Sequence, residues 1–151
     1  MANSQQEEIS IDLHLDEEAF PPRYASLEAA GADLHAHVEE PIEIQPGAMA
    51  LVPTGVAIAL PIGYEAQVRP RSGLALRSQV TVLNAPGTID SDYRGEICVI
   101  LINHGPTPFL VQPAMRIAQL VVAPVCRAKF VAVTALSGTE RGRGCFGHTG
   151  L

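Results

Sequence analysis

The chain has only three cysteines among its 151 residues, and their number and spacing exclude a disulfide framework. They stand singly at positions 98, 126 and 145, without a CxxC pair, which is typical of a protein from the reducing cytoplasm. Cys98 and Cys126 lie in apolar runs, where we expect them to be buried in the core. No run approaches the roughly 18 apolar residues of a membrane span. The polar, acidic N-terminal residues do not resemble a targeting peptide. We therefore expect a cytoplasmic protein with no membrane partner.

Positive charge is also scarce, since ten Lys and Arg stand against sixteen Asp and Glu. A chain with a net charge of −6 is a poor candidate for nucleic-acid binding, which depends on many contacts of Lys and Arg with phosphate, so we expect no nucleic-acid partner. Eight Arg and the single Lys nevertheless lie within residues 66–151. The planar guanidinium of Arg is well suited to phosphate. This distribution favours a small anionic ligand.

Long helices are excluded by 12 Pro and 13 Gly that recur at close spacing. Between these turn signals lie short apolar or alternating runs, a pattern that predicts an all-β sandwich or barrel. One short helical turn is expected at residues 74–78. The expected strands are residues 9–15, 42–44, 49–60, 62–68, 80–83, 97–102, 109–111, 117–125 and 130–133, with a turn at 53–55.

The end of the chain differs in composition from the rest. Five of the last fourteen residues are Gly, interleaved with Arg and Phe146. We predict a β domain over residues 1–134 and a flexible arm over residues 135–151. The arm contains GxGxxG at 142–147, but a dinucleotide site needs a strand before this motif and a helix after it. A lid that wraps phosphates and stacks Phe146 on a base fits this composition better than a dinucleotide site does. A disordered tail is the alternative, and on composition alone it is the commoner case.

Residues 84–96 are the most informative stretch, Asn-Ala-Pro-Gly-Thr-Ile-Asp-Ser-Asp-Tyr-Arg-Gly-Glu. They separate two aliphatic runs, 80–83 and 97–102, which predict antiparallel strands joined by a polar connection. Pro86-Gly87 is typical turn chemistry.

The side chains of this connection suit the recognition of a nucleotide. Asn84 can read the edge of a base, Asp90 and Asp92 can orient a water, and Tyr93 can stack on a ring. The alternative is an ordinary turn, in which Asn, Asp and Ser are common. A calcium loop is not supported, because Asp90 and Asp92 lack the remaining ligands.

A second candidate segment is Arg69-Pro-Arg-Ser-Gly73, which follows an expected strand. The Arg71 guanidinium, the Ser72 hydroxyl and the Gly73 backbone can hold a phosphate, and a solvated surface turn is the alternative. Ser72 lacks the GxSxG elbow of a nucleophile. His35 and His37 share a strand face and allow a metal site, although exposed strand histidines are commoner.

Taken together, five segments in order resemble the five motifs of the homotrimeric dUTPase family. They are Ala30-Gly-Ala-Asp-Leu34, Arg69-Pro-Arg-Ser-Gly-Leu-Ala75, residues 84–96, Arg116-Ile-Ala-Gln-Leu120 and Arg141-Gly-Arg-Gly-Cys-Phe-Gly-His-Thr-Gly150. Each motif alone is weak, but five in this order and spacing, over roughly residues 23–150, are specific. The resemblance implies hydrolysis of dUTP to dUMP and pyrophosphate, which keeps uracil out of DNA and supplies dUMP for thymidylate synthesis.

By this resemblance, Asp90 deprotonates the water that attacks the α-phosphorus. Such a base typically contributes about 10²–10⁴ in rate. Tyr93 would lie against the sugar and exclude a 2′-hydroxyl. Cytosine would leave buried polar groups of the site unpaired. The residues expected around uracil are Asn84, Gly87, Thr88, Ile89 and Cys98, with Phe146 of the arm covering the base.

The resemblance also assigns the phosphates and the cofactor. Arg71, Ser72 and Gly73 match the phosphate-binding motif, and Gln119 matches its partner on a later strand. Asp33 would hold a water of a Mg²⁺ ion that is bound mainly by the triphosphate. Arg141 would close on the γ-phosphate, as a second catalytic residue. Arg116 is expected to brace the site and the subunit interface.

The implied fold is a distorted jelly roll of the β-clip type in a threefold homotrimer. Each site would draw motifs one, two and four from one chain, the uracil hairpin from a second and the arm from a third. Cys145 stands where the family usually has Gly, and it would place a thiol beside the substrate. Two alternatives are a dCTP deaminase, which shares the fold, and a catalytically silent relative that acts as a regulator.

Overall fold

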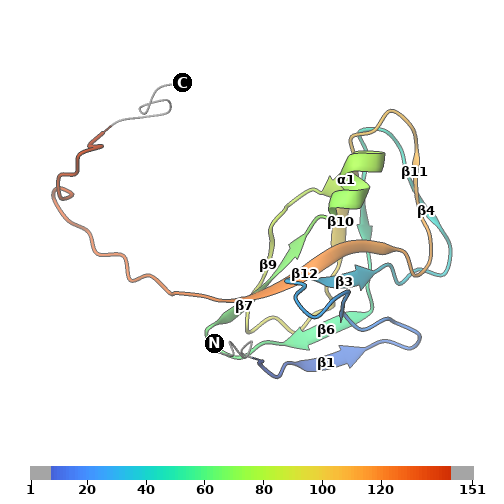
Figure 1. Cartoon of the computed structure of the whole chain (residues 1–151), viewed down its shortest axis with the longest axis horizontal. Helices are drawn as coiled ribbons and strands as arrows, with labels where there is room; N and C mark the ends of the chain where they lie inside the picture. The colour runs from blue at the N-terminus through green and yellow to red at the C-terminus, as the bar shows by residue number, and fades with distance from the viewer. Residues whose placement is uncertain (1–7, 144–151) are drawn as a thin grey trace.

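The computed structural model describes residues 8–143 and arranges them as a β sandwich with one short helix (Figure 1). Its largest sheet has five antiparallel strands. In spatial order they are β2 (Arg23–Tyr24), β3 (Ala32–His35), β12 (Arg116–Pro124), β7 (Tyr64–Arg69) and β9 (Gly87–Ile89). The strands that carry the second, third and fourth motifs are therefore neighbours in this sheet.

The remaining strands form three smaller sheets. β10 (Val99–Asn103) pairs with both β5 (Met49–Val52) and β8 (Val80–Val82). β1 (Asp12–Leu15) pairs with β6 (Val56–Ala59), and β11 (Phe109–Val111) pairs with β4 (Ile42–Ile44). The helix α1 (Ser72–Ser78) follows β7. Among the described residues, no helix has the length and apolarity that crossing a membrane requires.

The core lies between the sheets and follows from the alternation of side chains along each strand. In β10, for example, Val99 and Leu101 are completely buried, while the intervening Ile100 and Ile102 are half-buried on the other face. The largest fully buried side chains are Leu34, Ile44, Ile97, Leu101 and Ile117. This arrangement confirms the predicted all-β class.

Most predicted strands are present, with shifted ends. Residues 49–60 form two strands that separate at the expected turn, and α1 begins two residues before the predicted helical turn. β2 and β9 were not predicted, and β3 was implied only by the strand face assigned to His35 and His37. β9 was missed because Gly87-Thr-Ile89 has the composition of a loop. β9 forms because its backbone pairs with β7, an interaction that local sequence does not show.

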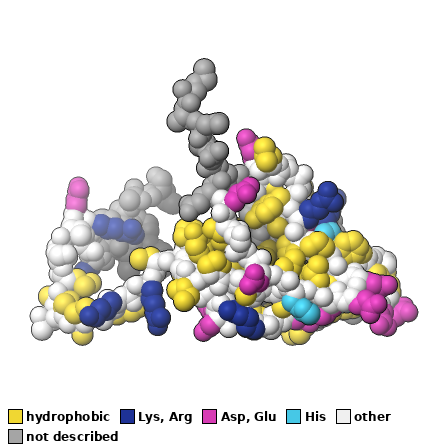
Figure 2. Space-filling model, turned by 90° about the horizontal axis from the view of Figure 1, so that it is seen from below, with side chains coloured by type: hydrophobic (Ala, Val, Ile, Leu, Met, Phe, Trp, Pro, Cys, Tyr) yellow, Lys and Arg dark blue, Asp and Glu magenta, His cyan; other side chains and the backbone are white. Residues whose placement is uncertain are grey.

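Two predictions about the C-terminal part are wrong. No strand forms at residues 130–133, and Cys126 is exposed instead of lying in the core. The reason is that β12 ends at Pro124 and residues 125–143 run away from the sheets, with Phe130 95% exposed (Figure 1). Figure 2 shows Lys and Arg side chains along this segment and hydrophobic patches on the body. Although several of its side chains are apolar, this segment is not packed against the sheets.

Candidate active site

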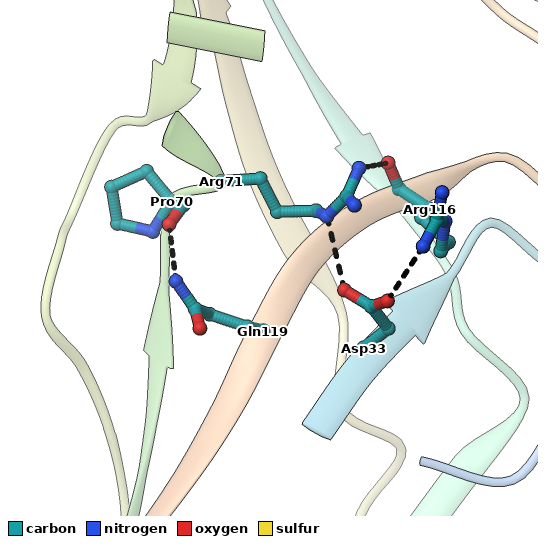
Figure 3. A network of polar contacts seen from close by, with 5 residues as sticks. All are labelled: Asp33, Pro70, Arg71, Arg116 and Gln119. Atoms are coloured by element: carbon teal, nitrogen blue, oxygen red, sulfur yellow. Dashed lines mark hydrogen bonds and ion pairs between the residues drawn. The ribbon is translucent and has the colours of Figure 1, made fainter. Parts of the chain in front are cut away.

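Asp33 joins two Arg side chains that come from distant parts of the chain (Figure 3). Its Oδ1 accepts a hydrogen bond from Arg71 Nε at 3.0 Å, and its Oδ2 accepts one from Arg116 Nη1 at 3.1 Å. Arg71 Nη1 also donates to the backbone O of Arg116, at 3.3 Å. Asp33 and Arg116 lie on the neighbouring strands β3 and β12, and Arg71 follows the end of β7. The sheet thus gathers residues from three of the five motifs.

The carboxylate of this network is compensated by two guanidinium groups, which leaves a net charge of +1. The Asp33 side chain is 14% exposed and that of Arg71 is 22% exposed. A carboxylate at this depth needs opposite charges and donors around it, and the two guanidinium groups supply both. A guanidinium has five N–H donors, so the contacts with Asp33 and Arg116 hold Arg71 in place without using all of them. Arg71 is therefore fixed in a position from which it can bind a phosphate.

His35 is the next titratable group along β3 on the same face as Asp33. Its ring centroid lies 5.0 Å from that of Phe20. Burial lowers the pKa of His35; the Asp33 carboxylate acts against this shift, and Arg116 and Arg71 add to it. The imidazole is consequently neutral near pH 7. It adds no charge to the network of Asp33, Arg71 and Arg116.

Gln119 connects this network to the backbone that precedes Arg71. It lies opposite Asp33 on β3 and opposite Arg69 on β7. Its Nε2 donates to the backbone O of Pro70 at 2.9 Å (Figure 3). Ser72 and Gly73 form the first turn of α1 directly afterwards. A surface pocket of about 370 Å³ lies beside these groups and is lined by Gln67, Arg69, Pro70, Ala85, Pro86 and Gln119.

Replacing Asp33 by Asn should destabilise the protein, because Asn removes the charge that two guanidinium groups share. Hydrogen bonds to charged groups contribute about 1.5–3 kcal/mol each, so we expect a loss of about 1–3 kcal/mol in the free energy of unfolding. Urea unfolding followed by circular dichroism measures this loss. The exposed Glu40→Gln is the matched control and should change stability by less than about 0.5 kcal/mol. Equal effects of the two substitutions would contradict the role given to the network.

The predicted connection at residues 84–96 joins two strands of the same small sheet. β8 and β10 pair antiparallel, with Leu101 opposite Val82, which confirms the predicted strand pair. Asn84 is exposed where the chain leaves β8, and Asp90 and Tyr93 are exposed beyond β9. Burial raises the pKa of the Cys98 thiol, and the Glu96 carboxylate adds to the shift by its charge and by a hydrogen bond. Cys98 is half-buried and remains protonated near pH 7.

The register of β9 separates Asp90 from Arg71 within one chain. Ile89 lies opposite Ala66, so Asp90 extends towards the start of β7, whereas Arg71 follows the end of β7. A strand rises about 3.3 Å per residue, so the backbone positions of the two residues lie roughly 13 Å or more apart along the sheet. A general base must lie within hydrogen-bond reach of the proton that it takes. In a single chain, the predicted base Asp90 therefore lies away from the predicted phosphate ligand Arg71.

Comparison with known proteins places this arrangement in a family. The family model for dUTPase matches residues 17–150. The chain is 54% identical over 145 residues to the deoxyuridine 5′-triphosphate nucleotidohydrolase of Chlamydia caviae, covering 94% of this chain and 99% of that protein. It is 57% identical over 143 residues to the protein of the same name from Chlamydia pneumoniae, with the same coverage. The chain belongs to the dUTPase family.

Solved structures of dUTPases share the fold. The Staphylococcus bacteriophage 80alpha dUTPase with dUpNHpp superposes with a TM-score of 0.85 at 23% identity, covering 94% of this chain and 99% of that one. The dUTPase from phage phi11 of S. aureus gives a TM-score of 0.78 at 20% identity, covering 87% and 100%. The predicted family, the jelly-roll fold and the dUTP diphosphatase class of enzyme are confirmed.

Within residues 8–143, one chain brings together part of the predicted site. Asp33, Arg71 and Gln119 meet, with Ser72 and Gly73 beside them. The residues from Asn84 to Cys98 lie on the hairpin. Arg141 lies on the exposed C-terminal segment, and Phe146 and Cys145 fall outside the described residues. The roles given to all these residues stay predictions.

The side chains around Asp33 fit a metal ion that arrives bound to the substrate, and not one held by the protein alone. Within residues 8–143, no group of three or more His, Cys, Asp and Glu side chains is placed to hold a metal ion. Both oxygens of Asp33 already accept a hydrogen bond from an Arg. Each carboxylate oxygen has two lone-pair directions, so Asp33 can still accept a hydrogen bond from a water of a hydrated cation. These residues fit a Mg²⁺ ion that is held mainly by a triphosphate and contacted through water.

Sequence reasoning missed two residues that anchor the hairpin. The Glu96 carboxylate and the Thr54 side chain join the end of the 84–96 loop to the turn between β5 and β6. Glu96 is the last residue of the third motif, and this position is the only feature of the sequence that points to its role. Thr54 lies in a plain Pro-Thr-Gly turn and carries no comparable signal.

Proposed function

We propose that this chain hydrolyses dUTP to dUMP and pyrophosphate in a Mg²⁺-dependent reaction. The match of the dUTPase family model to residues 17–150 carries this proposal, because this range contains all five motifs. Relatives 54–57% identical to this chain bear the name deoxyuridine 5′-triphosphate nucleotidohydrolase. The solved phage 80alpha dUTPase structure contains the nucleotide analogue dUpNHpp, and that of a mutant of the phage phi11 dUTPase shows a structural Mg(II) ion.

In this proposal the hairpin recognises the nucleoside and performs the chemistry. Asp90 takes a proton from the attacking water, and its exposed position beyond β9 leaves it open to solvent and substrate. The ring of Tyr93 packs against the deoxyribose. Asn84, the backbone of residues 87–89 and the region of Cys98 pair with the polar edge of uracil. The base is thereby read by groups that cytosine would leave unpaired.

The network of Asp33, Arg71 and Arg116 receives the phosphates. Arg71 and the first turn of α1 bind phosphate oxygens, and Gln119 assists from β12. Asp33 would hold a water of a hydrated Mg²⁺ ion, and this ion, when bound, would neutralise charge on the triphosphate and the leaving pyrophosphate. Arg141 closes on the γ-phosphate, and Phe146 covers the base. Closure excludes water other than the nucleophile.

We further propose that the enzyme is a homotrimer whose sites lie between chains. The separation of Asp90 from Arg71 along β7 supports this arrangement, since neighbouring chains can bring the two groups together. The outer face of the sheet of β5, β10 and β8 supports it as well. Leu51 and Met49 are 60% and 59% exposed there, opposite Ile100 and Ile102. A continuous apolar face of this kind marks an interface between proteins. The free Cys98 and Cys126 support a cytoplasmic location.

The decisive experiment incubates the purified protein with dUTP and Mg²⁺ and follows the release of pyrophosphate, with dCTP, dTTP and UTP in parallel. Release from dUTP alone is the expected result. Ammonia from dCTP without pyrophosphate would reassign the chain to deamination. Absence of turnover on all four nucleotides, with the trimer intact, would overturn the proposal and leave a nucleotide-binding regulator.

A further inference from the structure

The end of the 84–96 loop is fastened to the turn between β5 and β6. Glu96 Oε1 accepts hydrogen bonds from the backbone N of Thr54 at 3.0 Å and of Gly55 at 2.7 Å. Thr54 Oγ1 donates to the backbone O of Ile97, and the N of Ile97 donates to the O of Val56 at 2.7 Å. Four hydrogen bonds thus join two segments that are about forty residues apart in sequence.

This contact is buried and sterically restricted. Thr54 and Ile97 are each 1% exposed, so loss of the Thr54 hydroxyl would leave the carbonyl of Ile97 without water to replace it. Gly55 has a φ of +65°, and a Cβ there would lie 2.6 Å from the Cβ of Ala19. The turn therefore tolerates little change. It presents its two N–H groups to Glu96 in a fixed direction.

Tyr93 is attached directly to this fastened segment. Its hydroxyl donates to the backbone O of Glu96 at 2.9 Å. Its ring also packs over Gly95, where an added Cβ would lie 2.4 Å from Oη and 2.7 Å from Cζ. Since Tyr93 is 43% exposed, burial alone does not determine the direction of its ring. The space over Gly95 and the carbonyl of Glu96 determine it instead.

We propose that Gly95, Glu96 and Thr54 are positioning residues that set the discrimination between deoxyribose and ribose. This inference rests on the proposed function of Tyr93, whose ring is expected to exclude a 2′-hydroxyl. The ring of Tyr93 excludes the 2′-hydroxyl of a ribose only if the ring cannot move away from the sugar. Gly95 holds the ring on one side, and the carbonyl of Glu96 holds the phenol hydroxyl of Tyr93. The backbone N–H groups of Thr54 and Gly55 hold the Glu96 carboxylate in turn. The Thr54 hydroxyl holds the carbonyl of Ile97, the residue directly after Glu96. Substrate selectivity is thus fixed partly outside the substrate contacts.

The test compares kcat/KM for UTP with kcat/KM for dUTP. Gly95→Ala displaces the Tyr93 ring, so we expect the UTP to dUTP ratio to rise by about tenfold or more, the effect of a small change in a pocket. Tyr93→Phe removes only the hydrogen bond to Glu96 and should raise the ratio by a smaller factor. Glu40→Gln, an exposed change outside the loop, is the control and should leave the ratio within about twofold.

A second pair of variants separates positioning from folding. Thr54→Val removes the hydroxyl while keeping the shape, and we expect it to raise the UTP to dUTP ratio of kcat/KM. Thr54→Ser keeps the hydroxyl, and its ratio should equal that of the unchanged enzyme. Circular dichroism and the thermal midpoint show whether each variant is folded. Variants that lose stability while the ratio stays within about twofold would overturn the inference, because these residues would then be structural only.

Tyr93→Ala distinguishes the failure of this inference from that of the proposed function. If Tyr93→Ala raises the ratio and Gly95→Ala does not, the inference alone is wrong. If Tyr93→Ala leaves the ratio unchanged while dUTP is still hydrolysed, the proposed role of Tyr93 is wrong and the inference is overturned with it. A rise in the ratio for both variants is the expected result.

Discussion

Replacing Asp90 by Asn should lower kcat for dUTP by about 10²–10⁴-fold, the usual contribution of a positioned general base. Asn has nearly the same shape, but its amide cannot take a proton from the attacking water. Because Asp90 acts on the water and not on the phosphates, we expect KM to change much less than kcat. Stability should hardly change, since Asp90 is exposed beyond the end of β9. The measurement is the rate of pyrophosphate release at saturating dUTP.

Asp92→Asn is the matched control for this prediction, because it removes an exposed carboxylate two residues away in the same loop. It should keep kcat within about a factor of two to three of the unchanged enzyme. If Asp90→Asn retained more than about a tenth of kcat, or if both variants lost activity equally, Asp90 would not be the base.

The sequence predicts those parts of the fold that depend on local chemistry. Strands such as β4 and β11 are short β-branched or aromatic runs between turn residues, and these were predicted correctly. β9 was missed because Gly87, Thr88 and Ile89 become a strand only through pairing with β7, a partner about twenty residues away. Residues 130–133 were predicted as a strand because their composition is apolar, yet they pair with no strand among the described residues 8–143. In each case local propensity fails where a long-range contact decides.

The same distinction applies to the candidate site. Arg71, Asp33 and Gln119 were predicted through their motifs, and the structure places them together because β3, β12 and β7 are neighbours. The motif pattern could not show that Asp33 holds both Arg71 and Arg116. It also could not show Thr54, whose contact with Ile97 depends on two turns meeting in space. A motif names the residues that touch a ligand, whereas their support is spread along the chain.

Two inactive variants should recover activity when their chains are combined in one trimer. Asp90→Asn removes the base from the hairpin, and Arg71→Ala removes a phosphate ligand at the end of β7. If each site takes its hairpin from one chain and its Arg71 from a neighbour, a mixed trimer contains sites in which both residues are intact. Random assembly from equal amounts makes about a quarter of the sites intact, since each position is correct half of the time in a closed ring.

The experiment unfolds both variants together in urea, refolds the mixture and measures pyrophosphate release from dUTP. The mass of the product should correspond to three chains of 16.0 kDa. Because each variant alone is expected to lose at least about a hundredfold, a return to roughly a quarter of normal activity is easily detected. Asp90→Asn refolded with Asp90→Ala is the control, and it should stay inactive because no chain supplies the base. Failure of the first mixture to recover, with mixed trimers demonstrated, would show that one chain holds both residues at one site, against the separation that the register of β9 on β7 implies.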